Sequence, residues 1–202
     1  MTKLFFALVV TTAFLLGCNS EPSKGPAPAP AAPTVQTETG RFALQKMLVP
    51  ARFWAPDALP IRLDSTITKE SNGHDGKAAL WRTTFASAAR QKAEAFIWSG
   101  VSTPETPKGI SHGTEDTFNP ANRSTQPFDL NYLKIDSDEA FKVAQQHGGK
   151  ELLAKNPKMD VSYQLDFDPR LSQLKWHVIY GESPSPLTVL VDASTGQFIH
   201  KE

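Results

Sequence analysis

The pattern with the most direct chemical meaning is GISHG at residues 109–113, which fits Gly-x-Ser-x-Gly. In a nucleophile elbow this pattern holds a serine on a sharp turn between a strand and a helix, where the hydroxyl can attack an ester carbonyl. The flanking runs TPETPK and TEDTFNPANRS show neither the strand nor the helix that such a turn needs. We therefore expect no catalytic residue here, and a hydrolase using Ser111 and His112 is only the weaker alternative.

Two carboxylates and five histidines are the remaining residue types that could serve acid–base catalysis or metal binding. Asp166 and Asp168 alternate on a predicted strand that ends at Pro169, and such positions usually face solvent. The histidines are scattered, contain no His-Glu-x-x-His pattern and have no cysteine partner, at His74, His112, His147, His177 and His200. We predict no catalytic pair, no bound metal and no cofactor.

The charge of the chain is balanced, with 21 basic and 21 acidic residues among 202 and a formal net charge of +0. Proteins that bind nucleic acid normally carry a basic stripe or patch to neutralise phosphates. We therefore expect no nucleic-acid partner.

The N-terminus predicts export. Lys3 precedes an uncharged apolar run over residues 4–16, which is shorter than the ~20 residues of a membrane-spanning helix. That length suits the apolar region of a signal peptide. The run LLGC at 15–18 resembles the lipobox of bacterial lipoproteins, in which the cysteine becomes acylated and forms the new N-terminus. An ordinary signal peptide that contains a cysteine is the alternative.

The resemblance implies a signal peptide over residues 1–17 and lipidation of Cys18, for example with palmitate. Cys18 is the single cysteine of the chain, so no disulfide competes for it. The protein would then be held at a membrane of the cell envelope by its acyl chains. Asn19 after the cysteine resembles the signal for export to the outer membrane, where the protein would face the periplasm of a two-membraned bacterium.

Residues 18–38 are rich in proline and alanine, with GPAPAPAAP at their centre. A segment of this composition lacks the apolar bulk to fold and favours extended polyproline geometry. We interpret it as a disordered linker that lifts a folded domain away from the membrane.

The remaining chain shows a helix followed by strands, twice. Residues 39–100 predict a helix over 41–55, interrupted at Pro50, and strands over 60–70, 79–87 and 92–100. Residues 129–202 predict a strand at 130–135 and a helix opened by a capping box of Asp136 and Glu139, which the pair Gly148-Gly149 weakens or ends. Strands follow at 160–167, 174–180 and 187–192 before a final hairpin.

This order predicts an α+β fold of two repeats, each a helix on an antiparallel sheet, joined by a polar connecting loop over residues 101–128. Trp81 and Trp176 occupy matching places, each in the second predicted strand after its helix. That correspondence indicates an internal duplication.

The C-terminal third resembles a PepSY domain. The resemblance rests on the tryptophan-bearing strand at 176–180, on the VDASTG hairpin at 191–196 with its final apolar strand, and on the upstream helix with Ala140, Val143 and Ala144. It covers about residues 129–200, and the first repeat follows the same outline without that hairpin. It implies a cystatin-like fold, a role in binding or restraining peptidases, and no catalytic residues.

The expected function is therefore that of a membrane-anchored, non-catalytic PepSY-like lipoprotein that binds a peptide or protein partner, for which a peptidase is one candidate. The partner would add to a sheet edge or dock on an open sheet face. Trp98 and His177 are candidate binding residues in an exposed patch, because each alternates out of phase with some apolar neighbours. A structural envelope lipoprotein without a soluble partner is the main alternative.

Overall fold

The computed structural model of the protein describes residues 35–182 and 187–202. The predicted signal peptide, Cys18 and the linker up to residue 34 lie outside the described residues.

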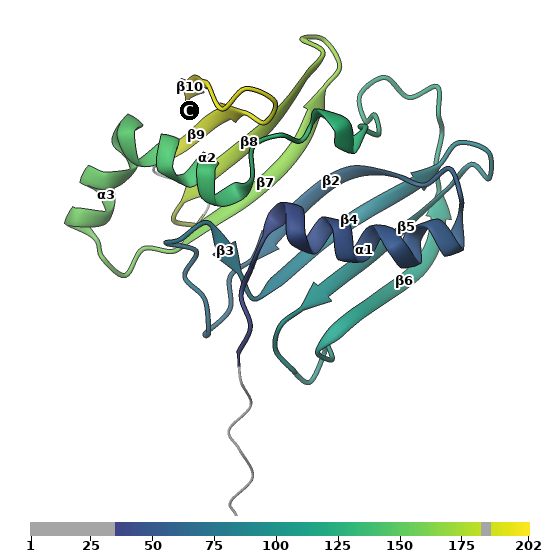
Figure 1. The fold of residues 1–202 in the computed structure, drawn as a ribbon, viewed down its shortest axis with the longest axis horizontal. Helices are drawn as coiled ribbons and strands as arrows, with labels where there is room; N and C mark the ends of the chain where they lie inside the picture. Colours follow the sequence, from purple (N-terminus) through teal and green to yellow (C-terminus); the bar gives the residue numbers. More distant parts are fainter. Residues whose placement is uncertain (1–34, 183–186) are drawn as a thin grey trace, which may run out of the picture. The chain divides into compact units, whose positions relative to one another are not determined.

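One eight-stranded antiparallel sheet dominates the fold (Figure 1). Its spatial order is β10-β9-β8-β7-β2-β4-β5-β6. The strands are β2 (Leu59–Thr66), β4 (Leu80–Ser87), β5 (Lys92–Ser99), β6 (Gly109–Thr117), β7 (Val161–Asp168), β8 (Gln173–Tyr180), β9 (Leu187–Asp192) and β10 (Phe198–Lys201). A separate two-stranded sheet pairs β1 (Glu38–Thr39) with β3 (Lys77–Ala78).

The two halves of the sheet meet at the antiparallel pair β2–β7. Only three residue pairs form this ladder, Arg62 with Asp166, Leu63 with Leu165, and Asp64 with Gln164. From this junction the strands of each half run outward in chain order, to β6 at one edge and β10 at the other. The antiparallel α+β fold class predicted from the sequence is confirmed.

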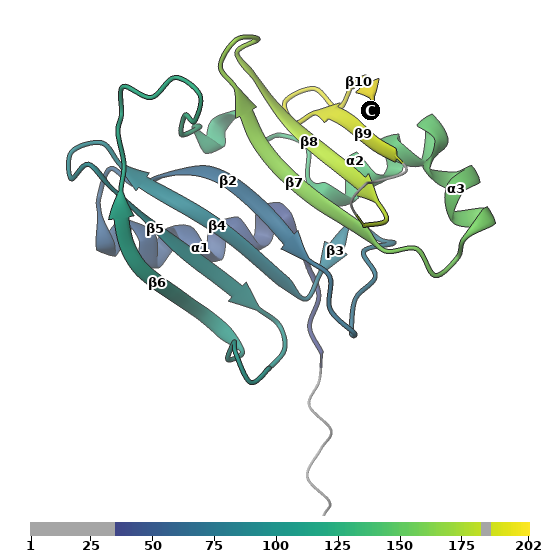
Figure 2. The same ribbon diagram turned by 180° about the vertical axis from the view of Figure 1, so that it is seen from behind.

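The helices lie against one face of the sheet, and the other face is left open (Figures 1 and 2). Helix α1 (Gly40–Trp54) packs on β4 and β5, whereas α2 (Ser137–Ala144) packs on β8 and β9. Beyond α2 follow a π-helical turn, η2 (Gln145–Gly149), and α3 (Lys150–Lys155). Leu44, Met47 and Ala51 of α1 are fully buried, as their helical spacing requires.

The main apolar core spans both halves between the helices and the sheet. At its centre the rings of Trp81 and Trp176 meet edge to face, with centroids 6.4 Å apart, and both side chains are fully buried. The two indoles donate to main-chain carbonyls, from Trp81 to Glu38 and from Trp176 to Ile135, each at 2.9 Å. Because the two tryptophans come from different halves, their contact ties the halves together.

Two of three predicted features of local structure are confirmed. Asp136 and Glu139 form the predicted capping box at the start of α2. The glycine pair interrupts the helix as expected, since Gly148 has a φ of +110°. At Pro50, however, the interruption was wrong, because α1 runs through this residue to Trp54.

The connecting loop predicted over 101–128 was wrong in its middle, where β6 pairs along β5. Nearly all β6 side chains are exposed or half-buried, so the strand carries no apolar alternation and is defined by its backbone pairing. The strand predicted at 130–135 is instead a 3₁₀ turn, η1 (Leu130–Tyr132), capped by the Asp129 side chain. The linker boundary at 38 was also too late, since the Gln36 amide donates to the Gly100 carbonyl.

Candidate functional site

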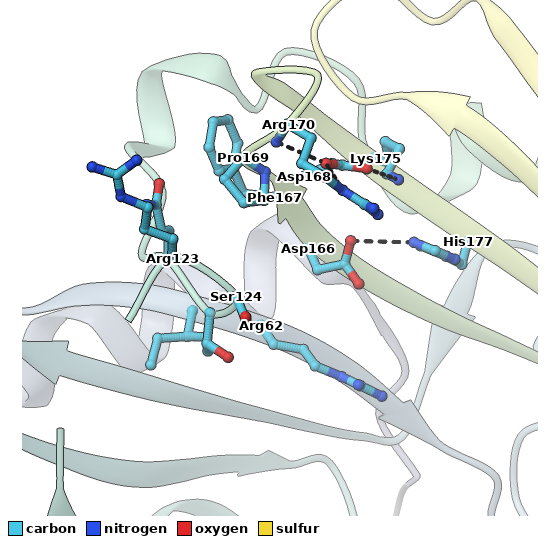
Figure 3. A pocket seen from close by; sticks show the side chains of 13 residues that line it. Arg62, Arg123, Ser124, Asp166, Phe167, Asp168, Pro169, Arg170, Lys175 and His177 are labelled. Atoms are coloured by element: carbon cyan, nitrogen blue, oxygen red, sulfur yellow. Dashed lines mark hydrogen bonds and ion pairs between the residues drawn. The ribbon is translucent and has the colours of Figure 1, made fainter. Parts of the chain in front are cut away.

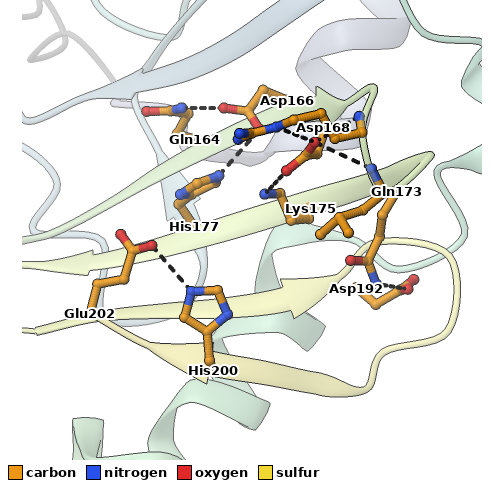
Figure 4. A network of polar contacts seen from close by, with 11 residues as sticks. Gln164, Asp166, Asp168, Gln173, Lys175, His177, Asp192, His200 and Glu202 are labelled. Carbon is orange, nitrogen blue, oxygen red and sulfur yellow. Dashed lines mark hydrogen bonds and ion pairs between the residues drawn. The ribbon is translucent and has the colours of Figure 1, made fainter.

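The open face of the sheet carries a continuous row of polar side chains over β7 and β8 (Figure 4). On β7, the buried side chains of Tyr163 and Leu165 point into the core. Because successive side chains of a strand alternate between its faces, Gln164 and Asp166 point to the open face. On β8, Trp176 and Val178 are buried, and His177 between them points outward. The two-residue period of the strands thus separates the core from this polar face.

Asp166 is held by two neighbours on this face. His177 Nε2 lies 3.2 Å from Asp166 Oδ1, and Gln164 Nε2 donates to Oδ2 at 2.5 Å. Burial raises the pKa of Asp166, but these hydrogen bonds outweigh it, so the pKa lies below the usual aspartate value. The carboxylate therefore stays ionised over the whole neutral range.

Asp168 is held in the same way at the end of β7. Lys175 Nζ donates to Oδ2 at 3.1 Å, and the backbone amide of Arg170 donates to Oδ1 at 3.0 Å. The hydrogen bond from Lys175 is the main cause that lowers the pKa of Asp168. The Lys175 side chain is only 11% exposed, so this ion pair is sheltered from water, whereas the Arg170 side chain is 90% exposed.

The neighbouring strand β2 adds the ion pair of Arg62 and Asp64. Arg62 Nε lies 2.7 and 2.9 Å from the two carboxylate oxygens of Asp64. Burial raises the pKa of Asp64 above the usual value, although Arg62 opposes this shift. Arg62 lies directly opposite Asp166 across the β2–β7 junction. The polar row therefore crosses from one half of the sheet to the other.

A pocket of about 750 Å³ opens at this crossing (Figure 3). One side is formed by the loop at 123–126, a second by Ile61 and Arg62, and a third by residues 166–170 together with Lys175 and His177. The wall mixes charged groups with the apolar surfaces of Ile61, Phe167 and Pro169, a combination typical of ligand pockets. Each half of the chain supplies part of the wall.

The predicted site residues do not come together. His177 lines the pocket and is 18% exposed. Trp98 is 6% exposed and belongs to the core on the helix-covered face, so the exposed position expected for it was wrong. It forms a cross-strand pair with Trp81, whose side chain points to the same covered face. Asp166 and Asp168 were expected to face solvent, but both are bound into the polar network.

Ser111 and His112 occupy consecutive positions of β6, so their side chains point to opposite faces of the sheet. His112 stacks on Phe96 on the helix-covered face and places Nδ1 2.5 Å from Glu94 Oε1. Ser111 therefore lies in an edge strand and has no strand-to-helix turn around it.

The residues predicted from the sequence did not include the cationic side chains of the pocket, which are Arg62, Arg123, Arg170 and Lys175. The polar alternation at 164, 166 and 168 and at 173, 175 and 177 was a usable signal for one polar face. The loop residue Arg123 carries no such periodic signal, because only the tertiary structure brings its loop beside β2 and β7.

Within residues 35–182 and 187–202, no cluster of three or more His, Cys, Asp or Glu side chains could hold a metal ion. In the same part of the chain, no helix is both long and apolar enough to cross a bilayer.

No protein-family model matches this chain, and no curated protein matches it. Among solved structures, the chain is similar to one named "putative lipoprotein (CD1622)" from Clostridium difficile 630. The match has a TM-score of 0.53 and 13% sequence identity, and it covers 79% of this chain and 91% of the other. At this identity the likeness concerns the fold alone.

Proposed function

We propose that the protein is a lipid-anchored, non-catalytic binding protein of the bacterial cell envelope that docks a peptide or protein partner on the open face of its sheet. The observation that carries this proposal is the pocket of about 750 Å³ at the β2–β7 junction, on the face that the helices leave uncovered. Pockets that combine apolar walls with a few placed polar groups are the usual binding sites of proteins.

Anchoring through Cys18 is supported by the lipobox-like run at 15–18 and by the name of the structurally similar protein. The linker after it would let the domain reach a partner at a distance from the membrane. Metabolic labelling with palmitate tests the anchor. Label should attach to the native chain and be lost in Cys18→Ser, and label that persists in the variant would refute lipidation at this residue.

A tandem PepSY-like origin is also part of the proposal. Each half is a helix followed by four strands of the main sheet, with Trp81 and Trp176 in matching strands. In the second half, the Asp192 side chain accepts from the Ser194 and Thr195 amides at 2.7 and 2.9 Å. Gly196 closes the turn with a φ of +78°. The PepSY resemblance makes a peptidase the first partner to test.

The absence of catalysis belongs to the same proposal and has its own test. The opposite orientation of Ser111 and His112 argues against their joint action on a substrate. Generic ester substrates should be hydrolysed no faster with the native protein than with Ser111→Ala. Activity that disappears in this variant would establish a hydrolase instead.

Site-specific photocrosslinking in intact cells tests partner docking. A photoreactive amino acid at Thr125, on the pocket wall, should give a discrete crosslinked product. Matched positions are the exposed Thr114 on the edge strand β6 and the exposed Gln45 on α1. A crosslinked product from Thr114 alone would instead show that the partner binds at the sheet edge, where it could add as a further strand. No product at any position would favour the structural lipoprotein.

A further inference from the structure

We infer that the pocket at the β2–β7 junction is selective for an acidic peptide segment with two or more carboxylates. This inference rests on the proposed function, because it names the chemistry of the partner that the open face would bind.

The pocket is cationic in a chain whose formal net charge is +0. Its wall contains four cationic side chains and two carboxylates, a formal excess of +2 with His177 neutral. These are Arg62, Arg123, Arg170 and Lys175 against Asp166 and Asp168. A local excess of this sign attracts anionic groups and repels cationic ones.

The two carboxylates of the wall accept their hydrogen bonds from groups other than the arginine side chains, although Arg170 Nε lies at ion-pair distance, 3.8 Å, from Asp168. Asp168 accepts hydrogen bonds from Lys175 and from the backbone amide of Arg170, and Asp166 is held by Gln164 and His177. Neither carboxylate accepts a side-chain hydrogen bond from Arg62, Arg123 or Arg170 within the described residues, so these two groups do not occupy the arginine donors.

Three arginines retain donor capacity at the rim. Within the described residues, Arg123 makes no hydrogen bond or ion pair, and it is exposed. Arg62 binds Asp64 through Nε only, which leaves its terminal nitrogens. Arg170 is 90% exposed, with its Nε 3.8 Å from Asp168. Each guanidinium can bind a carboxylate through two parallel hydrogen bonds.

The placement of these arginines favours several carboxylates over one. Figure 3 shows the Arg123 and Arg62 side chains on different sides of the pocket, and Arg170 on the hairpin side beside Asp168. A single carboxylate cannot reach all three, and one exposed ion pair contributes little binding. An extended peptide can present successive acidic side chains to the separate arginines, while Ile61, Phe167 and Pro169 offer apolar contact.

A peptide titration tests this selectivity on the full chain purified in detergent. The probe is Ala-Glu-Ala-Glu-Ala-Glu-Ala with blocked ends and an uncharged fluorophore, and its control has glutamine at each glutamate. Fluorescence anisotropy in about 20 mM salt should show the glutamate peptide bound at least about tenfold more tightly. The combined variant R123Q/R170Q should remove this preference.

Arg52→Gln is the matched control, because Arg52 is exposed on α1 on the helix-covered face and the variant loses the same kind of charge. It should leave the preference unchanged. Equal binding of the two peptides, or an equal loss in Arg52→Gln, would overturn the inference. Succinate that displaces the peptide at equal concentration would overturn the peptide assignment in favour of a small dicarboxylate.

The outcomes also separate this inference from the proposed function. A crosslink at Thr125 in cells, combined with equal binding of the two peptides, would overturn the charge selectivity alone. Absence of the crosslink together with absence of peptide binding would overturn both.

Discussion

Replacing Trp176 by phenylalanine tests whether the two halves of the protein form one cooperative unit. The β2–β7 ladder that joins them has three residue pairs, so we expect the shared core to contribute most of the coupling. Trp176 is fully buried, contacts Trp81 of the other half, and donates to the Ile135 carbonyl at 2.9 Å. Phenylalanine keeps an aromatic ring but removes this donor and part of the contact.

The expected loss can be estimated from these contacts. Leaving the half-buried Ile135 carbonyl without its partner costs about 1–3 kcal/mol. The lost edge-to-face contact and the small cavity add about 1 kcal/mol. We therefore expect Trp176→Phe to lower the free energy of unfolding by about 3 kcal/mol, which is a large share of the ~5–15 kcal/mol of a typical domain.

Urea denaturation followed by far-ultraviolet circular dichroism measures this loss without relying on tryptophan fluorescence. The matched control is Trp54→Phe, because Trp54 is half-buried and donates at 2.7 Å to the partly exposed Glu115. The control should cost about 1 kcal/mol or less. Equal losses in the two variants would refute the central role of Trp176, and two separate transitions in the native protein would refute the single core.

Three further predictions concern local features. Gly149→Ala should destabilise the fold by about 2 kcal/mol or more, because a Cβ there would lie 2.0 Å from the Tyr180 hydroxyl oxygen. Gly113→Ala should be neutral or slightly stabilising, since its nearest neighbour lies at 3.8 Å. Asp136→Ala should cost about 1–2 kcal/mol through loss of the helix cap. Finally, the pKa of Asp166 is lower in the folded protein than in the unfolded chain, so ionisation of this carboxyl stabilises the fold at pH values above the unfolded pKa of about 3.9. This contribution is lost as the pH falls through the folded pKa.

Chemical denaturation checks all three. For the glycines, equal midpoints of the two variants would contradict the close approach of Gly149 to Tyr180. For the cap, a loss in Asp136→Ala no greater than that in Asp138→Ala, whose side chain forms an i,i+4 pair with Lys142 on the helix surface, would contradict its importance. For the titration, Asp166→Asn should flatten the fall of stability as the pH drops below the unfolded aspartate value of about 3.9, and an unchanged slope would contradict the assigned pKa direction.

Several elements were determined by the sequence alone, because they depend on interactions between near neighbours. The capping box needs only Asp136 and Glu139 at a spacing of three, and the break at Gly148 needs only a residue that adopts positive φ. The strands with buried residues at every second position, such as β8, were also predictable from their period. The antiparallel α+β class follows from the order of these elements.

The pocket was decided by the tertiary structure. Its wall combines Arg62, Arg123 and His177, whose positions in the chain are far apart, and neither their spacing nor their types marks them as neighbours. The edge strand β6 shows why some local structure also escaped prediction: with both faces largely exposed, it is defined by pairing to β5 and leaves no apolar period. The burial of Trp98 could not be predicted for a different reason. The position of the helices decides which face of a strand is covered, and this position is set by the tertiary structure.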